Sequence, residues 1–326
     1  MSNCGRNALQ LSPGDERGRA TTGVEQVAQR MRPFVIRSRS LSMRTKSMSM
    51  VNGNTTPIER LLALVLGLLR MPPGRRRIRI AFLYGLLCHV VFALAVGAMI
   101  VAMFFGMSES LGRLQKPWSF LANAFLIAQF PLIHSLLLSA RGSKLLKWFA
   151  PAKYATTLST TTFAIIASIQ LIVLFALWTP SGVVWWRAEG LVFYVFCTLY
   201  ASSWLLLIKA SYDAGAEVQS GALGWMSMAQ DKRPVFPGMP TAGLFRHIRQ
   251  PIYVSFALTL WTVPVWTPDQ LALAVLLTAY CLLAPKLKEA RFEMRYGDSF
   301  QNYKNNVPYV MPYLRRHKHK KQHALE

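Results

Sequence analysis

Cysteine is scarce in this chain of 326 residues, and none of its four cysteines belongs to a CxxC motif. Cys88, Cys197 and Cys281 lie inside apolar runs, where cysteine usually serves as a small buried hydrophobe. The spacing therefore supports neither a disulfide framework nor a zinc site, and we expect no bound metal.

Charged residues are also few, and acids are especially rare. They make up 16% of the chain, with 14 Asp and Glu against 37 Lys and Arg, for a net charge of +23. Soluble proteins carry about 25% charged residues. The basic residues gather in an N-terminal arm, in Arg75–Arg77, in the tail 315–321 and in short loops between apolar runs. Cytoplasmic basic residues beside anionic lipid explain this pattern, so we expect membrane lipid, and no nucleic acid, as a partner.

Long apolar runs are the dominant feature, and 52% of the residues are hydrophobic. A run of roughly 20 apolar residues spans the hydrocarbon core as a helix, and runs of this length exclude a β-barrel. We predict an all-α fold, a polytopic membrane helix bundle of about six spans. The predicted spans are 80–106, 118–138, 158–178, 189–208, 252–266 and 270–285. The last two are short and closely spaced, which indicates a C-terminal helical hairpin.

The flanking segments divide the rest of the chain. Residues 1–56 are Ser- and Arg-rich without apolar periodicity, which predicts a disordered basic arm; a targeting presequence or an extended start are the alternatives. Residues 57–79 predict an interfacial amphipathic segment, with a plain packing helix as the alternative. Residues 80–313 form the membrane domain, and 314–326 form a basic tail. We find no internal repeat.

The loops indicate the orientation. Lys and Arg number four in loop 139–157 and five in loop 209–251, whereas the alternate connections hold two, one and none. Basic loops stay in the cytoplasm. We therefore predict a multi-pass protein with both termini cytoplasmic, in a membrane such as the bacterial inner membrane.

Two polar segments flank the hairpin. The first, 243–253, places Arg246, His247, Arg249 and Gln250 immediately before Pro251. Proline suits the first turn of a helix, and a helix N-terminus favours anions such as carboxylate or phosphate. The alternative is that the arginines only mark the cytoplasmic interface.

The second segment follows the hairpin on the same side of the membrane. It contains Lys288, Glu289, Arg291 and Glu293, and then Tyr296-Gly297. Its acids could pair with the arginines of the first segment or hold a cationic ligand. The alternative is a solvated helix.

Together these segments read G-L-x-R-x-x-R-x-P-x-Y, a hairpin, an acidic segment, and Tyr-Gly-(x)5-Tyr-(x)3-Val-Pro. This order resembles the isoprenylcysteine carboxyl methyltransferase and phospholipid methyltransferase superfamily, and is most similar to its NnrU and methanethiol S-methyltransferase groups. Looser similarities lie upstream, at Ile133-His134-Ser135, at 178–186 and at Tyr212-Asp213. The resemblance covers about 115–313.

The resemblance implies a helix bundle whose cytoplasmic pocket binds S-adenosyl-L-methionine. It implies that Arg249, Gln250, Pro251 and Tyr253 line this pocket, and that Lys288 and Glu289 close it from the other side. It also favours a substrate role for His134; a hydrogen-bonded core histidine is the alternative. Methyl transfer from a sulfonium mainly requires positioning of donor and acceptor.

Three positions depart from the family pattern. Gln250 stands where the family has His, Lys288 where it has Glu, and Ser255 where it usually has Gly. We therefore carry two hypotheses. The first is an S-adenosylmethionine-dependent methyltransferase acting on a small thiol or lipophilic acceptor, and the second is a non-catalytic relative with a degenerate cofactor site. The spans show neither the paired acids nor the inverted repeat typical of many transporters.

The predicted topology can be tested with reporter fusions. We expect a fusion at Leu314 to report the cytoplasm and one near Ser181 to report the opposite side, because basic loops remain cytoplasmic. Alkaline phosphatase and green fluorescent protein fusions measure the two sides in parallel. An external report at Leu314 would overturn the orientation.

Overall fold

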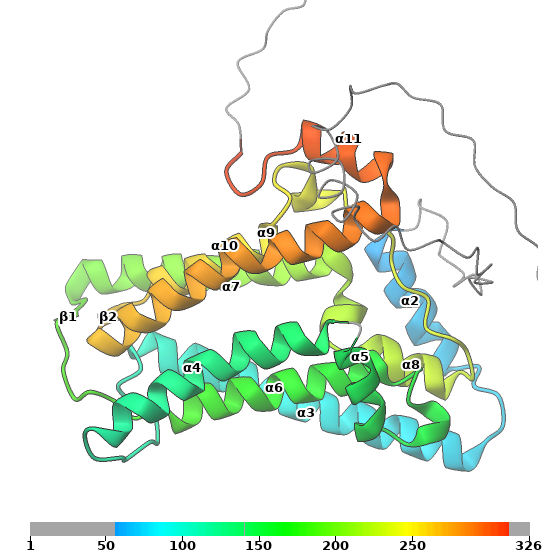
Figure 1. Ribbon diagram of the computed structural model, residues 1–326, viewed down its shortest axis with the longest axis horizontal. Helices are drawn as coiled ribbons and strands as arrows, with labels where there is room; N and C mark the ends of the chain where they lie inside the picture. Colours follow the sequence, from blue (N-terminus) through cyan, green and yellow to red (C-terminus); the bar gives the residue numbers. More distant parts are fainter. Residues whose placement is uncertain (1–55, 140, 313–326) are drawn as a thin grey trace, which may run out of the picture. The chain divides into compact units, whose positions relative to one another are not determined.

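The computed structural model describes residues 56–139 and 141–312. The chain divides into two units, 1–48 and 49–326, and every described residue belongs to the second. The predicted N-terminal arm, apart from Thr56, and the predicted basic tail lie outside the described residues. Figure 1 shows the described residues of the second unit in colour.

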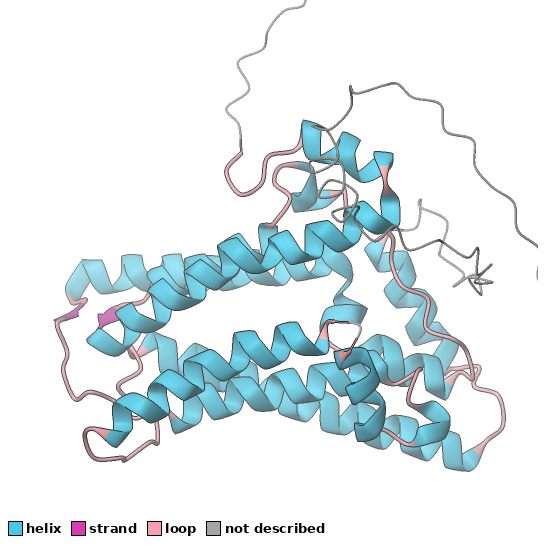
Figure 2. Cartoon of the chain, viewed as in Figure 1, coloured by secondary structure: helices cyan, strands magenta, loops and turns pink. Residues whose placement is uncertain are grey.

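The described part is almost entirely helical (Figure 2). The helices are α2 (Pro57–Leu68), α3 (Arg75–Phe104), α4 (Trp118–Leu137), α5 (Gly142–Leu145), η1 (Leu146–Phe149), η2 (Ala152–Tyr154), α6 (Ser159–Leu177), α7 (Gly190–Gln219), α8 (Ala222–Ala229), η3 (Gly243–Arg246), α9 (Pro251–Trp261), α10 (Pro268–Tyr296) and α11 (Asp298–Asn306). Two short strands, β1 (Trp186–Arg187) and β2 (Val265–Trp266), pair antiparallel. The predicted all-α membrane bundle is confirmed.

Within residues 56–139 and 141–312, five helices are long and apolar enough to cross a membrane, namely α3, α4, α6, α7 and α10. The sixth apolar helix, α9, has only 11 residues, about 16 Å at 1.5 Å per residue. The predicted span 252–266 is therefore too long, because the chain leaves the helix before Pro264 and extends into β2. The predicted end at residue 285 is also too early. Pro285 lies inside α10, and the helix formers that follow it carry the helix on to Tyr296.

The connections after α3, α6 and α9 meet at one end of the bundle, on the left in Figure 1. The amide of Leu111 donates to the carbonyl of Ala176 at 2.7 Å, and the Thr267 hydroxyl donates to the carbonyl of Gly106. Successive apolar helices therefore alternate in direction, as the loop charges predicted.

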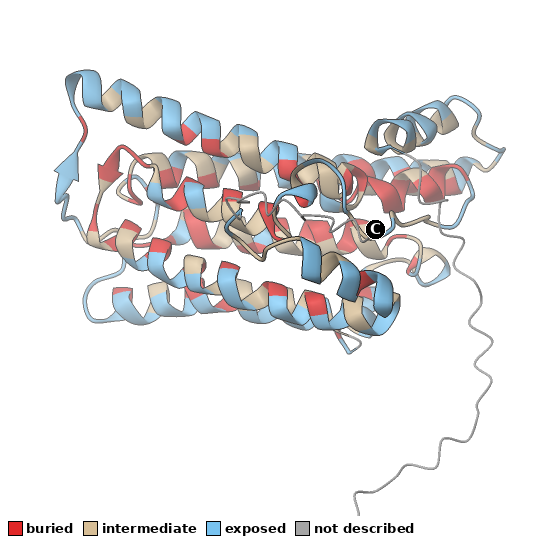
Figure 3. Cartoon of the chain, turned by 90° about the horizontal axis from the view of Figure 1, so that it is seen from above, coloured by how far each residue is buried: buried red, intermediate tan, exposed pale blue. Residues whose placement is uncertain are grey.

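Helices α3, α4 and α6 form one layer, and α7, α9 and α10 form the other. A core near the β1–β2 end joins both layers through side chains such as Met103, Leu174, Leu260 and Leu273, all fully or almost fully buried. Figure 3 shows buried residues recurring between exposed ones along the long helices. Many exposed residues are large and apolar, as expected for a surface that faces lipid rather than water.

Helix α2 lies across the opposite end of the bundle (Figure 1). A capping box begins it: the Thr56 hydroxyl accepts from the Glu59 amide, and the Glu59 carboxylate accepts from the Thr56 amide. It contacts α7 and α8, yet no residue of α2 is buried, and Leu66 is 56% exposed. This placement favours the predicted interfacial role.

A buried amide pair between α4 and α6 provides a test of packing. Gln129 Nε2 donates to the Gln170 carbonyl at 3.1 Å, and Gln170 Nε2 donates to Gln129 Oε1 at 2.8 Å. Changing Gln170 to Leu should destabilise the bundle by about 1–2 kcal/mol, because Gln129 Oε1 loses its donor in a buried site, whereas the bond from Gln129 Nε2 to the main-chain carbonyl of residue 170 remains. The double variant Q129L/Q170L should recover most of this loss. Thermal unfolding in detergent measures both, and an additive loss would contradict the pairing.

Candidate functional site

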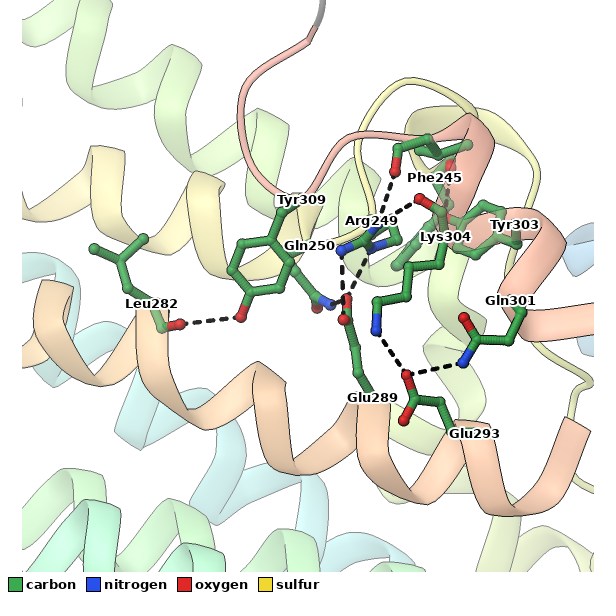
Figure 4. Close-up of polar contacts among 11 residues, drawn as sticks. Phe245, Arg249, Gln250, Leu282, Glu289, Glu293, Gln301, Tyr303, Lys304 and Tyr309 are labelled. Carbon is green, nitrogen blue, oxygen red and sulfur yellow. Dashed lines mark hydrogen bonds and ion pairs between the residues drawn. The ribbon is translucent and has the colours of Figure 1, made fainter. Parts of the chain in front are cut away.

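Two side chains 40 residues apart meet at the mouth of the hairpin (Figure 4). Arg249 lies between η3 and α9, and Glu289 projects from α10. Arg249 Nε donates to Glu289 Oε1 at 2.9 Å, and its Nη2 lies 3.4 Å from Oε2. Both side chains are 10% exposed. Of the possibilities that the sequence left open for these acids, the structure shows pairing with an arginine across the hairpin. The pair is bidentate, the geometry that best matches a guanidinium to a carboxylate.

Gln250 completes this pair. Its Nε2 donates to Glu289 Oε1 at 2.7 Å, so one carboxylate oxygen receives two hydrogen bonds. The other amide atom, Gln250 Oε1, is buried without a partner in the described part of the chain. It is therefore an acceptor ready for a donor that the described residues do not supply.

The C-terminal segment closes over Arg249, and sequence reasoning missed this. Arg249 Nη1 donates to the carbonyls of Lys304 at 2.8 Å and Val307 at 2.9 Å. The backbone amides of Arg249 and Gln250 donate to the carbonyls of Pro308 and Tyr309. The Val-Pro end of the motif was the available signal, but backbone carbonyls carry no residue identity, so the contact could not be read from the sequence.

Two tyrosines hold this segment in place. Tyr303 OH donates to the carbonyl of Phe245 at 2.6 Å, and Tyr309 OH donates to the carbonyl of Leu282 at 3.0 Å. Burial raises the pKa of Tyr303 to about 12, while Arg249 lowers it and Glu289 raises it by smaller amounts. The Tyr303 phenol is therefore neutral and remains a donor at any physiological pH.

Lys288 does not pair with an acid in the described structure. Its Nζ lies 5.6 Å from the centre of the Phe245 ring and 5.5 Å from that of Phe292. Aromatic faces attract cations and compensate part of the lost hydration. The ammonium is thus held between two rings at the same mouth as Glu289.

The remaining predicted residues lie on α9. Pro251 occupies its first turn, as expected, and is buried. Tyr253 is half-buried and interacts electrostatically with Arg291 and Tyr309. The Ser255 hydroxyl, where the family has no side chain, donates to the carbonyl of Pro251 at 2.7 Å and is fully buried. The Ser255 side chain is therefore accommodated within α9.

The space inside the cluster is small, about 10 Å³, which is room for about one water molecule. Its walls are Pro240, Phe245, Arg249, Gln250, Lys288, Glu289, Phe292, Phe300 and Tyr303. In this conformation the cluster is closed, and a ligand of nucleoside size requires its walls to move apart.

His134 does not join this cluster, because it is absent from the walls of the cavity. It lies in the last turn of α4, with ring centres of Phe130 and Phe163 at 5.1 and 4.9 Å. Its Nδ1 is buried without a partner in the described part. Beside it, Ser135 Oγ lies 3.5 Å from Tyr280 OH of α10.

Fold and site together define a polytopic helical membrane protein with an ion-paired polar cluster at one mouth of its bundle. No family model matches the chain, and no solved structure does. It is 29% identical to methanethiol S-methyltransferase of Pseudomonas deceptionensis over 61% of this chain and 75% of the relative. It is 25% identical to the enzyme of the same name from Crocosphaera subtropica, over 71% and 91%.

A third similarity is to mouse nurim, at 34% identity over 40% of this chain and 51% of nurim. The resemblance to the membrane methyltransferases of the isoprenylcysteine carboxyl methyltransferase superfamily is thereby confirmed, and this chain is related to the methanethiol S-methyltransferases.

The contribution of the buried Arg249–Glu289 ion pair to stability can be compared with that of the more exposed Lys304–Glu293 pair. The acids of both pairs lie on α10. Glu289→Gln should lower the free energy of unfolding by about 3 kcal/mol, because Arg249 then remains as a buried charge without its partner. Glu293→Gln removes the exposed pair with Lys304 and should change stability little. Thermal unfolding in detergent compares the two variants. Equal effects would show that the Arg249–Glu289 pair is not the structural tie that its burial indicates.

Proposed function

We propose that this protein is a membrane methyltransferase that transfers the methyl group of S-adenosyl-L-methionine to a small thiol of the methanethiol class. The observation that carries this proposal is the similarity, over 61% to 72% of the chain, to relatives named methanethiol S-methyltransferase. A lipophilic acceptor is the broader form of the same proposal.

The residues of the cluster fit the cofactor in chemical type. S-adenosylmethionine carries a sulfonium, an ammonium and a carboxylate. Arg249 can hold the carboxylate through its fork of donors, and Glu289 can hold a cationic group. The unpartnered Gln250 Oε1 can accept from an ammonium or hydroxyl. Pro251 places the α9 N-terminus beside these groups, which also favours an anion.

Because the cluster is closed, the C-terminal segment, residues 304–309, also controls entry of the cofactor. Because the cavity now admits about one water molecule, entry of the cofactor requires separation of Arg249 from Glu289 or displacement of residues 304–309. Phe245, Phe292 and Tyr303 then remain around the bound group and exclude water. A dry site protects an activated methyl group from hydrolysis.

When bound, the cofactor supplies an activated methyl group whose carbon–sulfur bond breaks as the thiol sulfur forms a new one. The products are a thioether and S-adenosylhomocysteine, and the thiol proton is released. His134 is assigned to the acceptor side, because a buried imidazole nitrogen without a partner can accept a thiol S–H. Its two phenylalanine neighbours suit a small apolar acceptor.

Lys288 allows the cofactor site to be tested by charge. Lys288→Glu changes the local charge by two units next to a site for a cationic ligand. A charge pair 4 Å apart contributes roughly 4 kcal/mol at a dielectric of 20, and even 1.4 kcal/mol is tenfold in affinity. We therefore expect weak binding of S-adenosylmethionine by the unchanged protein and at least about tenfold tighter binding by K288E. Calorimetry on protein in detergent measures both.

The matched control is Lys286→Glu, because Lys286 lies on the same helix, is exposed and does not line the cavity. It should leave the affinity nearly unchanged, since exposed charges are screened. If neither the unchanged protein nor K288E/Q250H binds the cofactor, the proposal fails in favour of a non-catalytic relative. Formation of dimethyl sulfide from methanethiol then tests the acceptor separately.

A further inference from the structure

A second and larger cavity lies where α2 crosses the ends of α7 and α8. Its volume is about 430 Å³, within the range of small-molecule sites. Its walls include the charged residues Arg60, Glu217, Lys232 and Arg233 and the apolar residues Leu64 and Leu223. None of these residues lines the Arg249–Glu289 cluster. The cavity therefore has no role in the proposed methyl transfer.

The acids of this cavity are already engaged. Glu217 is 1% exposed and accepts from Arg60 Nε at 3.0 Å. Glu59 accepts from the Thr56 amide at 2.9 Å as part of the α2 cap. Asp231, which precedes Lys232 and Arg233 in the sequence, does not line the cavity. Its Oδ2 lies 3.1 Å from Arg77 Nη1. The Glu217 charge is thus balanced by Arg60, and the Glu59 carboxylate is held by the backbone at the start of α2.

Lys232 and Arg233 are different, because both are exposed and line the cavity. Neither side chain has a hydrogen bond or ion pair to another residue of the described part. Two adjacent cations without acids attract an anion, and a phosphate or carboxylate can accept hydrogen bonds from both.

Other walls of the cavity are apolar, which favours a ligand that has an apolar part as well as an anionic group. Ala63, Leu64, Leu223 and Val235 make part of the cavity apolar. Gly67 lets α2 approach α8 closely, since a Cβ there would lie 2.0 Å from Gln230 Oε1. Gln230 Nε2 also donates to the carbonyl of Leu64 at 2.8 Å. These contacts fix α2 against α8 beside the apolar walls.

The position of α2 indicates where the ligand comes from. It lies across the end of the bundle and runs obliquely to the long helices (Figure 1). Large apolar side chains of α2, including Ile58, Leu62 and Leu66, are more than half exposed. A helix of this kind lies in the interface between headgroups and acyl chains. The cavity beneath it is therefore supplied with lipid from the membrane surface.

We propose that the cavity between α2, α7 and α8 binds an anionic phospholipid. Its phosphate lies at Lys232 and Arg233, and the first part of an acyl chain lies against Leu64, Leu223 and Val235. The same cations would also attract free phosphate, but the apolar walls favour the lipid.

The experiment uses the full-length protein in detergent and measures thermal unfolding with increasing phosphatidylglycerol, phosphatidylcholine or inorganic phosphate. We expect saturable stabilisation by phosphatidylglycerol at concentrations at least tenfold lower than those required of the other two. K232Q/R233Q should weaken the phosphatidylglycerol effect about tenfold or more. A63W, which fills the apolar part, should remove the lipid effect and leave the weak effect of inorganic phosphate unchanged.

The matched control is R75Q/R76Q, which removes two exposed arginines near the start of α3 that do not line the cavity. It should retain the response to phosphatidylglycerol. If it loses the response as fully as K232Q/R233Q, the lipid is bound by general surface charge and the proposal is overturned. Equal effects of phosphatidylglycerol and phosphatidylcholine, a response to inorganic phosphate as strong as that to phosphatidylglycerol, or no response at all, would also overturn it.

Discussion

The ion pair between Arg249 and Glu289 is the interaction on which the polar cluster at the mouth of the hairpin depends. It joins the segment before α9 to α10, and the same guanidinium binds the carbonyls of Lys304 and Val307. Three stretches of chain are thus held by one side chain. Removing two charges from water is costly, and the cost is recovered only when every donor finds a partner. Arg249 makes four hydrogen bonds, two to the Glu289 carboxylate and two to carbonyls, which satisfy most of its five N–H donors.

The Arg249–Glu289 cluster encloses almost no space, about 10 Å³, and most of its polar atoms already bond to one another. Binding a cofactor therefore has to replace internal bonds with bonds of the same kind. A ligand with both a carboxylate and cationic groups can do so, since it offers a partner to Arg249 and another to Glu289. The Gln250 Oε1 atom has no partner in the described part, and a ligand donor there would add a bond rather than exchange one. The departures from the family pattern therefore leave a polar site of a suitable kind.

The two ends of the bundle are organised by different forces. At one end, strands β1 and β2, a buried core and the Asp269 carboxylate, which accepts from Trp178 Nε1 and the Ser181 amide, join the loops tightly. At the other end, a smaller apolar cluster around Ala81, Trp225 and Met228 lies beside ion pairs such as Arg60–Glu217 and Arg249–Glu289, and both cavities lie there. Binding sites require parts that can separate, and hydrogen-bonded polar contacts exchange with a ligand more readily than a packed apolar core does.

The sequence by itself determined the class of fold, because uninterrupted apolar runs have few structural solutions in a membrane. It also indicated that the acids after the C-terminal hairpin could pair with the arginines before it, since a helical hairpin returns the chain to its starting side. It could not determine where α9 and α10 end, because Pro264 stops one helix whereas Pro285 is accommodated within the other. Nor could it show that Lys288 Nζ lies beside the rings of Phe245 and Phe292, or that His134 does not line the cavity of the Arg249–Glu289 cluster. Those outcomes depend on side-chain direction and on backbone carbonyls of distant segments, which only the tertiary structure decides.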